Sequence, residues 1–141
     1  MPMQTFLPYC DFSDSLQALD DRRLGKQRVE AFQILNILLG RTQTKGWRNH
    51  PAILMWTGYS EVLKIYFNIS IEEWERRGFR NNLQPESTDS EIKIYPAWLG
   101  DPNFHASHRS NLLRKDFKFY SRYGWKEPPD LPYFWPTEHG Y

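Results

Sequence analysis

The sequence has only one cysteine, Cys10, which excludes an internal disulfide and is typical of a reducing compartment. It has no apolar run long enough to cross a bilayer, and its start lacks the features of a secretory signal peptide. We therefore expect a cytoplasmic protein that does not associate with membranes. Neither positive nor negative charge is in clear excess. The formal net charge is +1 at pH 7, so bulk electrostatics alone does not predict a polyanionic partner.

Aromatic residues, by contrast, are abundant, at 16% of 141 residues with six Trp. This length predicts one domain, residues 1–141, that can bury a core without disulfides or a metal. The charges are unevenly distributed: residues 105–122 hold five Lys or Arg against one Asp, whereas residues 72–91 hold six Asp or Glu against three Arg. Such asymmetry indicates one basic face.

Apolar spacing predicts three main helices and no strands. The first begins with Ser13 or Asp14 as N-cap and runs to Leu39, the second runs from Pro51 to Gly78, and the third opens at Asp101-Pro102. An irregular N-terminal arm precedes them, and a strap rich in Pro and aromatic residues follows. We expect an all-α, single-domain bundle.

The first helix contains an unusually charged stretch, "DDRRLGKQRVE", at residues 20–30. Helical geometry places Arg22 and Lys26 one turn apart, with Arg23 and Gln27 beside them, facing solvent or a ligand. Gly25 in this stretch costs about 1 kcal/mol relative to Ala, which close approach of a ligand backbone would explain. The alternative is an ordinary solvated helix face.

The opposite side of this helix is expected to face the core through Val29, Phe32 and Leu35.

The segment "KGWRNHP" offers Trp47 to stack on a base, while Arg48 and His50 contact phosphates at a helix start. Trp47 could equally fill the core.

The third helix carries the remaining basic segment, "HASHRSNLLRKD". Its expected phosphate contacts are His105, His108, Arg109 and Arg114, although buried structural histidines are the alternative. The His-x-x-His spacing lacks further ligands, so we expect no metal site. Together, three basic segments interleaved with aromatic residues predict one concave surface that binds nucleic acid.

Several segments resemble a known family. They are "TFLPYCDF", "LDDRRLGKQRVEA", "GWRNHPAILMWTGY", "EWERRGF", "WLGDPNFHASHRSNLLRKD" and "LPYFWP". The chain is similar to the small pyrimidine-dimer DNA glycosylases of the phage endonuclease V type, and especially to a shorter bacterial branch. The resemblance implies an all-α fold with the N-terminal arm threaded between helices. It also implies action on damaged DNA without metal or cofactor. We expect a monomer whose partner is double-stranded DNA that is damaged or modified.

In that family the α-amine exposed by removal of Met1 attacks C1′ of the damaged nucleotide, and the resulting imine leads to β-elimination. The resemblance therefore implies Pro2 as the nucleophile and Arg22 as a substrate-binding residue. Arg23 occupies the expected position of the catalytic glutamate, so Asp21 or Glu30 would have to replace it. Lys26 is an alternative amine or a phosphate contact.

Three functions follow as hypotheses. The first is a DNA glycosylase with AP-lyase activity on damaged or modified pyrimidines. The second is a DNA-binding protein that keeps the scaffold without the chemistry, which the replacement by Arg23 favours. The third is a nuclease or hydrolase with His105 or His108 as general base, because histidine serves that role near neutral pH.

Overall fold

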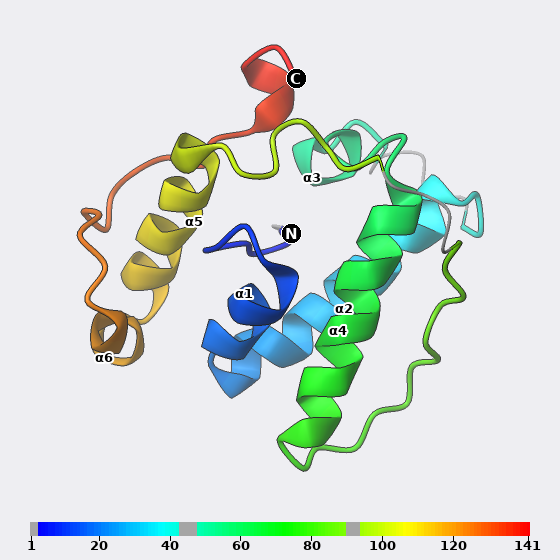
Figure 1. The fold of residues 1–141 in the computed structure, drawn as a ribbon, viewed down its shortest axis with the longest axis horizontal. Coiled ribbons are helices and arrows are strands. Elements are labelled where there is room, and N and C mark those ends of the chain that lie inside the picture. The colour runs from blue at the N-terminus through cyan, green and yellow to red at the C-terminus, as the bar shows by residue number, and fades with distance from the viewer. Residues whose placement is uncertain (1–2, 43–47, 90–93) are drawn as a thin grey trace.

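The computed structural model describes residues 3–42, 48–89 and 94–141, and within them the fold is entirely helical (Figure 1). The elements are α1 (Phe12–Ala18), α2 (Asp21–Leu38), α3 (Pro51–Leu54), α4 (Ser60–Arg76), α5 (Pro102–Lys115), α6 (Phe117–Tyr120) and the 3₁₀ helices η2 (Ser121–Tyr123) and η3 (Pro136–Glu138). The prediction of an all-α bundle built on three main helices, here α2, α4 and α5, is confirmed. None of the described helices is long and apolar enough to cross a membrane.

Two predicted helices are each divided. Residues 13–39 form α1 and α2, because Leu19 and Asp20 adopt extended backbone angles between them. The N-cap of α1 is Asp11, whose carboxylate accepts from the Asp14 amide, and not Ser13 or Asp14 as predicted. Residues 51–78 form α3 and α4, separated by a turn in which Gly58 has φ +87°.

The third helix begins as predicted. Asp101 caps α5 with its side chain, which accepts from the Asn103 amide at 2.9 Å, and Pro102 occupies the first turn, where its missing N–H has no cost. The helix ends at Lys115, one residue before α6. Lys115 is therefore the last residue of α5.

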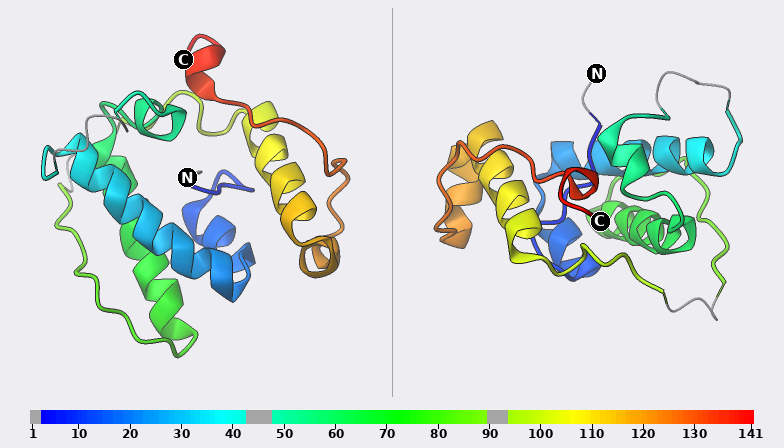
Figure 2. Two further views of the ribbon diagram at one scale, coloured as in Figure 1. Left: turned by 180° about the vertical axis from the view of Figure 1, so that it is seen from behind. Right: turned by 90° about the horizontal axis from the view of Figure 1, so that it is seen from above.

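The core forms where α2 packs against α4 and where α1 covers α4 (Figure 2). Leu24 and Ile34 of α2 and Leu63 and Phe67 of α4 are fully buried. Val29, expected in the core, is instead 40% exposed, and Gln27, expected on the solvent side, is buried. The buried face of α2 is therefore rotated relative to the prediction, so that it includes the polar side chain of Gln27 in place of Val29.

Gly25 serves helix packing rather than ligand approach. A Cβ atom added to Gly25 would lie 3.0 Å from two ring carbons of Trp74 on α4. The Trp74 ring is fixed by stacking on Phe79 and by donating its Nε1–H to the Arg80 carbonyl at 3.0 Å. The expectation of close ligand approach at Gly25 is thus corrected: the glycine admits an indole ring.

Replacing Gly25 with Val is expected to lower the free energy of unfolding by about 1–3 kcal/mol, the range for overpacking at a tight interface. The reason is the forced displacement of Trp74. Urea unfolding monitored by circular dichroism measures the change. The control is Lys26→Val at the next, exposed position, where a shift of similar size would show that helix propensity, and not the Trp74 contact, sets the loss.

The N-terminal arm lies between α5 on one side and α2 and α4 on the other (Figures 1 and 2). Residues 3–8 are buried, yet the arm belongs to no helix or sheet, so its backbone groups need side-chain partners. Those partners come from every main helix. The bonds are Gln4 N to Glu30, Phe6 N to Gln27, Tyr66 to Phe6 O, Leu7 N to His108, His105 to Leu7 O, and Arg109 to Pro8 O.

Candidate functional site

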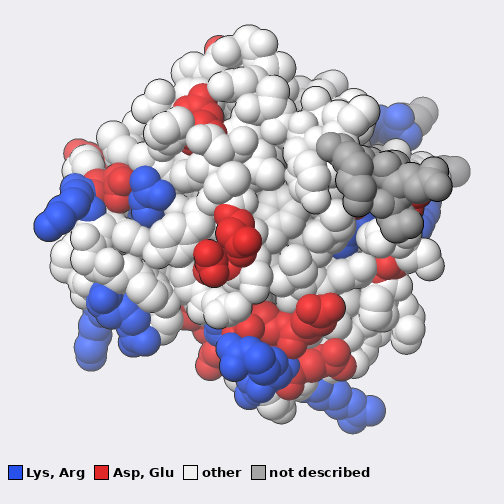
Figure 3. All heavy atoms as spheres, in the orientation of Figure 1, with Lys and Arg blue, Asp and Glu red and all other residues white. Residues whose placement is uncertain are grey.

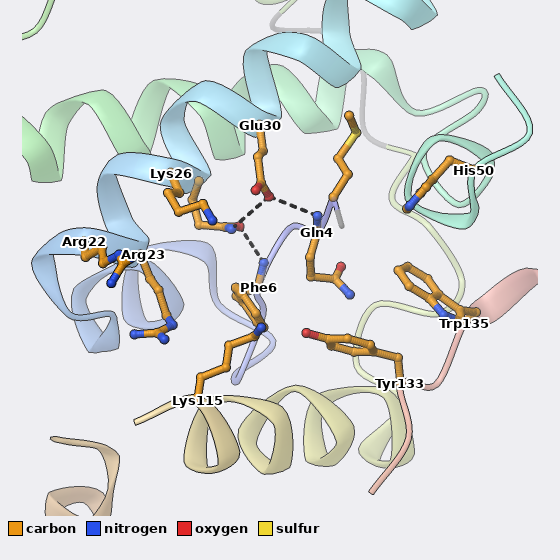
Figure 4. A pocket seen from close by; sticks show the side chains of 12 residues that line it. Gln4, Phe6, Arg22, Arg23, Lys26, Glu30, His50, Lys115, Tyr133 and Trp135 are labelled. Carbon is orange, nitrogen blue, oxygen red and sulfur yellow. Dashed lines mark hydrogen bonds between the residues drawn. The ribbon is translucent and has the colours of Figure 1, made fainter. Parts of the chain in front are cut away.

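A cavity of about 300 Å³ opens where the arm meets α2, the end of α5 and the C-terminal strap (Figure 4). We call it the main cavity. Its lining residues are Met3, Gln4, Phe6, Arg22, Arg23, Lys26, Gln27, Glu30, His50, Lys115, Tyr133 and Trp135. The volume is at the lower end of the range for small-molecule sites.

Among the described residues that line the main cavity, Glu30 is the only carboxylate. It is 7% exposed, and its Oε2 accepts from the Gln4 amide at 3.0 Å and from Gln27 Nε2 at 3.4 Å. Burial raises the pKa of Glu30, and the Gln4 bond and the nearby Lys26 and Lys115 oppose part of that rise. A carboxyl group with a raised pKa is suited to exchange protons near neutral pH.

The register of α2 determines where Glu30 points. Arg23, Lys26, Gln27 and Glu30 recur at intervals of three and four residues and therefore share one helix face. Gln27 fixes the geometry of this face, because its Oε1 accepts from the Phe6 amide at 2.6 Å and from the Tyr66 hydroxyl at 2.9 Å. With Oε1 occupied, its NH₂ group is directed to Glu30.

One side of the main cavity is cationic. Its members, which we call the cationic wall, are Arg22, Arg23 and Lys26 of α2 and Lys115 of α5. Among the described residues, only Arg23 of the four forms an ion pair, with Asp20 at 3.2 Å. Burial lowers the pKa of Lys115, and the neighbouring Arg23, Arg114 and Lys26 lower it further. The cationic wall is thus a place where an anion is stabilised.

The face of the molecule drawn in Figure 3 carries Lys and Arg interspersed with Asp and Glu, without one continuous field. In the main cavity, four cations and one buried carboxylate lie around a single hollow (Figure 4).

The other side of the main cavity is aromatic. We call Phe6, His50, Tyr133 and Trp135 the aromatic wall. The Tyr133 and Trp135 rings lie 5.4 Å apart, and the His50 ring meets Trp135 edge-on at 6.0 Å. His50 Nδ1 accepts from the Ala52 amide as the cap of α3, and burial lowers the pKa of His50, which favours the neutral form of the ring. Flat, uncharged rings favour stacking with a planar ligand.

His105 and His108 do not reach the main cavity. His108 Nδ1 accepts from the Leu7 amide at 2.9 Å, and His105 Nδ1 donates to the Leu7 carbonyl at 2.8 Å while its Nε2 accepts from the Gly100 amide. Burial lowers the pKa of His108 to about 3. The expected phosphate contacts and the general-base role are corrected, because both rings are buried and hold the arm.

Three other expected site residues have partners outside the main cavity: Arg109, Arg114 and Asp21. Arg109 donates to the Pro8 carbonyl at 2.7 Å and pairs with Glu127 at 2.9 Å, so it binds the arm rather than lining the cavity. Arg114 donates to Asn111 on its own helix. Asp21 pairs with Arg77 at 2.9 Å and does not line the cavity, which leaves Glu30 as the carboxylate of this site.

Arg48 is exposed and is not a lining residue. Trp47 and Pro2 lie outside the described residues, although Met3, which is bonded to Pro2, lines the cavity. Among the described residues, no three His, Cys, Asp or Glu side chains are grouped to hold a metal.

Sequence reasoning missed six lining residues: Met3, Gln4, Phe6, Lys115, Tyr133 and Trp135. Lys115 ends the "HASHRSNLLRK" segment and could have been found from its charge. The other five carry no local signal, because only the folded path of the arm and of the strap brings them beside α2 (Figure 4).

Among known proteins, no curated protein and no solved structure showed significant similarity to the chain. The model of a family described as pyrimidine dimer DNA glycosylase matches residues 3–87, which include the arm, α2 and α4. Glu30, Gln4 and three members of the cationic wall lie within the matched part. The chain belongs to the pyrimidine dimer DNA glycosylase family.

Proposed function

We propose that this protein is a DNA glycosylase with AP-lyase activity, which removes a damaged or modified pyrimidine from double-stranded DNA through an imine-forming amine. One observation carries the proposal above all: the buried carboxyl group of Glu30 lies in the cation-lined main cavity, hydrogen-bonded to the arm. Membership of the family supports DNA as the substrate.

In the proposed reaction an unprotonated amine attacks C1′ of the target nucleotide. The N–C1′ bond forms as the bond from C1′ to the base breaks, and the base leaves with the electron pair and gains a proton. The sugar ring then opens at the C1′–O4′ bond, which gives an iminium ion. Loss of a C2′ proton breaks the C3′–O3′ bond, and the downstream strand leaves with a 5′ phosphate. Water then hydrolyses the iminium ion, which frees the amine and leaves an unsaturated aldehyde on the upstream strand. Glu30 would stabilise the developing positive charge and exchange the protons.

The amine is proposed to be the α-amino group of Pro2. A chain α-amine has a pKa of roughly 7.7–8.0, so part of it is neutral at physiological pH. Support comes from the neighbouring residue, since Met3 lines the main cavity. Lys26 and Lys115 are the competing amines in the same cavity, and the lowered pKa of Lys115 makes it the stronger competitor.

Incubation with duplex DNA that contains an abasic site, followed by borohydride, is expected to trap a covalent protein–DNA adduct, because borohydride reduces an imine. Retention of Met1, or acetylation of the α-amine, should abolish the adduct if Pro2 is the nucleophile. Lys26→Ala and Lys115→Ala test the other amines against Lys118→Ala, an exposed control on α6. Binding to this DNA without any trapped adduct would contradict the proposal.

One observation favours a second function, a DNA-binding protein without catalysis. Arg23 occupies the position at which the resemblance implies the catalytic carboxylate, and a cation there opposes a positively charged transition state. Arg23 is, however, paired with Asp20, and Glu30 supplies a carboxylate to the same cavity. We therefore prefer the enzyme, and the trapping experiment separates the two functions.

A further inference from the structure

Asp20 occupies the N-cap position of α2, where an aspartate ordinarily accepts from the first amides of the helix. Among the described residues, its side chain forms no such capping bond. Both carboxylate oxygens instead accept from Arg23 Nη1 at 3.2 Å, and Oδ1 also accepts from the Tyr120 hydroxyl. The carboxylate of Asp20 therefore serves the Arg23 guanidinium in place of the helix.

Tyr120 fixes this carboxylate from a distant part of the chain. Its side chain on α6 is fully buried, and its ring stacks on Trp125 with an interplanar angle of 12°. The Tyr120 hydroxyl also accepts from the Asp20 amide at 3.1 Å. Burial and the bond to Asp20 raise the pKa of Tyr120, so the hydroxyl keeps its proton and remains a donor to Asp20.

Arg23 lines the main cavity and lies on the same face of α2 as Glu30, two helical turns away. Two turns span about 10 Å, a distance that an extended Arg and a Glu side chain can bridge. Figure 4 shows the Arg23 side chain directed away from Glu30. The members of the cationic wall that lower the pKa of Glu30 are Lys26 and Lys115. Arg23 acts instead on Lys115, whose pKa it lowers.

We infer that Asp20 is a positioning residue, which holds the Arg23 guanidinium at the edge of the main cavity and away from Glu30. This inference rests on the proposed function. Among the described residues that line the cavity, Glu30 is the one carboxylate to which a released Arg23 could turn. Such a pair would neutralise the carboxylate and bring a cation beside a sugar that becomes positively charged, which raises the barrier.

Replacing Asp20 with Asn tests this role, because Asn keeps the shape and an acceptor for Tyr120 but lacks the charge that retains Arg23. A ¹³C NMR titration of the side-chain carboxyl carbon measures the pKa of Glu30. This pKa is expected to be lower in Asp20→Asn than in the wild type, since the released guanidinium favours the carboxylate form.

A double-mutant cycle separates release of Arg23 from the direct loss of the Asp20 charge. Charge effects between groups that do not move are additive, whereas movement of Arg23 is not. Arg23→Gln is therefore expected to raise the pKa of Glu30 more in the Asp20→Asn background than in the wild type. The matched control is Asp14→Asn, which removes the same charge at an exposed position of α1 and should leave the pKa of Glu30 unchanged.

The same variants are compared in single-turnover nicking of abasic DNA. Asp20→Asn is expected to nick about tenfold more slowly, which corresponds to the lower end of the effect of one charge about 4–6 Å away. Its affinity for this DNA should not fall, because the variant gains one net positive charge. Adding Arg23→Gln to Asp20→Asn should recover most of the lost rate, which a purely structural role of Asp20 would not allow.

Additive effects of the two substitutions on the pKa of Glu30 would overturn the inference, as would a loss of nicking that persists in the double variant. The titration requires no catalysis. Absence of nicking in the wild-type protein would contradict the proposed function, while the titration would still decide whether Asp20 keeps Arg23 away from Glu30.

Discussion

Replacing Glu30 with Gln is expected to lower the rates of base excision and strand nicking by about 10²–10⁴-fold, the usual contribution of a positioned proton-transfer group. Gln has nearly the same shape, and its Oε1 can still accept from the Gln4 amide that Glu30 now binds. The arm should therefore stay in place. Removal of a negative charge beside the cationic wall should leave DNA affinity unchanged or slightly higher.

The same substitution is expected to stabilise the fold at alkaline pH. Burial raises the pKa of Glu30, so the folded state holds this proton more tightly than the unfolded chain does. The stability that the group contributes is then fully present below the unfolded pKa and is lost as pH rises through the folded pKa. Gln is neutral throughout, so the variant should be more stable than the wild type at pH 8, with the difference shrinking toward pH 4.

Single-turnover nicking of abasic DNA and urea unfolding at both pH values measure these two effects. Glu72→Gln, at an exposed position of α4, is the matched control and should change neither. A Glu30→Gln variant that nicks DNA at the wild-type rate would eliminate Glu30 as the catalytic carboxylate. A variant that is less stable at pH 8 would show that the negative charge itself supports the arm.

Combined replacement of Arg22, Lys26 and Lys115 by Ala is expected to weaken DNA binding by two to three orders of magnitude at about 0.1 M salt. The estimate assumes one phosphate contact for each cation and about 0.9 units of log–log salt slope for each contact. The slope itself should therefore fall by about three. The melting temperature should change little, because none of the three side chains forms an ion pair among the described residues.

The control for this variant removes the same charge elsewhere. Arg80, Lys118 and Lys126 are exposed and do not line the main cavity, so their combined replacement by Ala leaves the cationic wall intact. If both triple variants lose the same affinity and salt slope, net charge alone governs binding. In that event the main cavity would not be where phosphates are held.

Local pattern was sufficient to locate the three main helices, but not to predict where the chain breaks between helices or which residues form the site. Apolar spacing located α2, α4 and α5, and the Asp101-Pro102 signal identified the start of α5. It could not show that Leu19 and Asp20 turn the chain between α1 and α2, because the partner that holds Asp20 is Tyr120, about a hundred residues away.

The histidines illustrate why charge and residue type misled. His105 and His108 look like phosphate ligands in sequence, but they bind the arm backbone, a partner that no spacing rule reveals. Glu30 was one of two candidates from the resemblance. It is buried in the main cavity and contacts Gln4, whereas Asp21 pairs with Arg77 outside the cavity. A group of polar residues on a helix indicates a binding partner, but it does not show whether that partner is DNA or another segment of the same chain.

The arm also determines when in folding the main cavity can exist. Its bonds join residues 26 apart for Gln4 and Glu30, 60 apart for Phe6 and Tyr66, and 101 apart for Leu7 and His108. Contacts of such separation form late, because closing long loops must precede them. Individual helices can therefore nucleate early. The main cavity, and with it the proposed catalytic site, is complete only after the N-terminal arm has packed against distant helices of the chain.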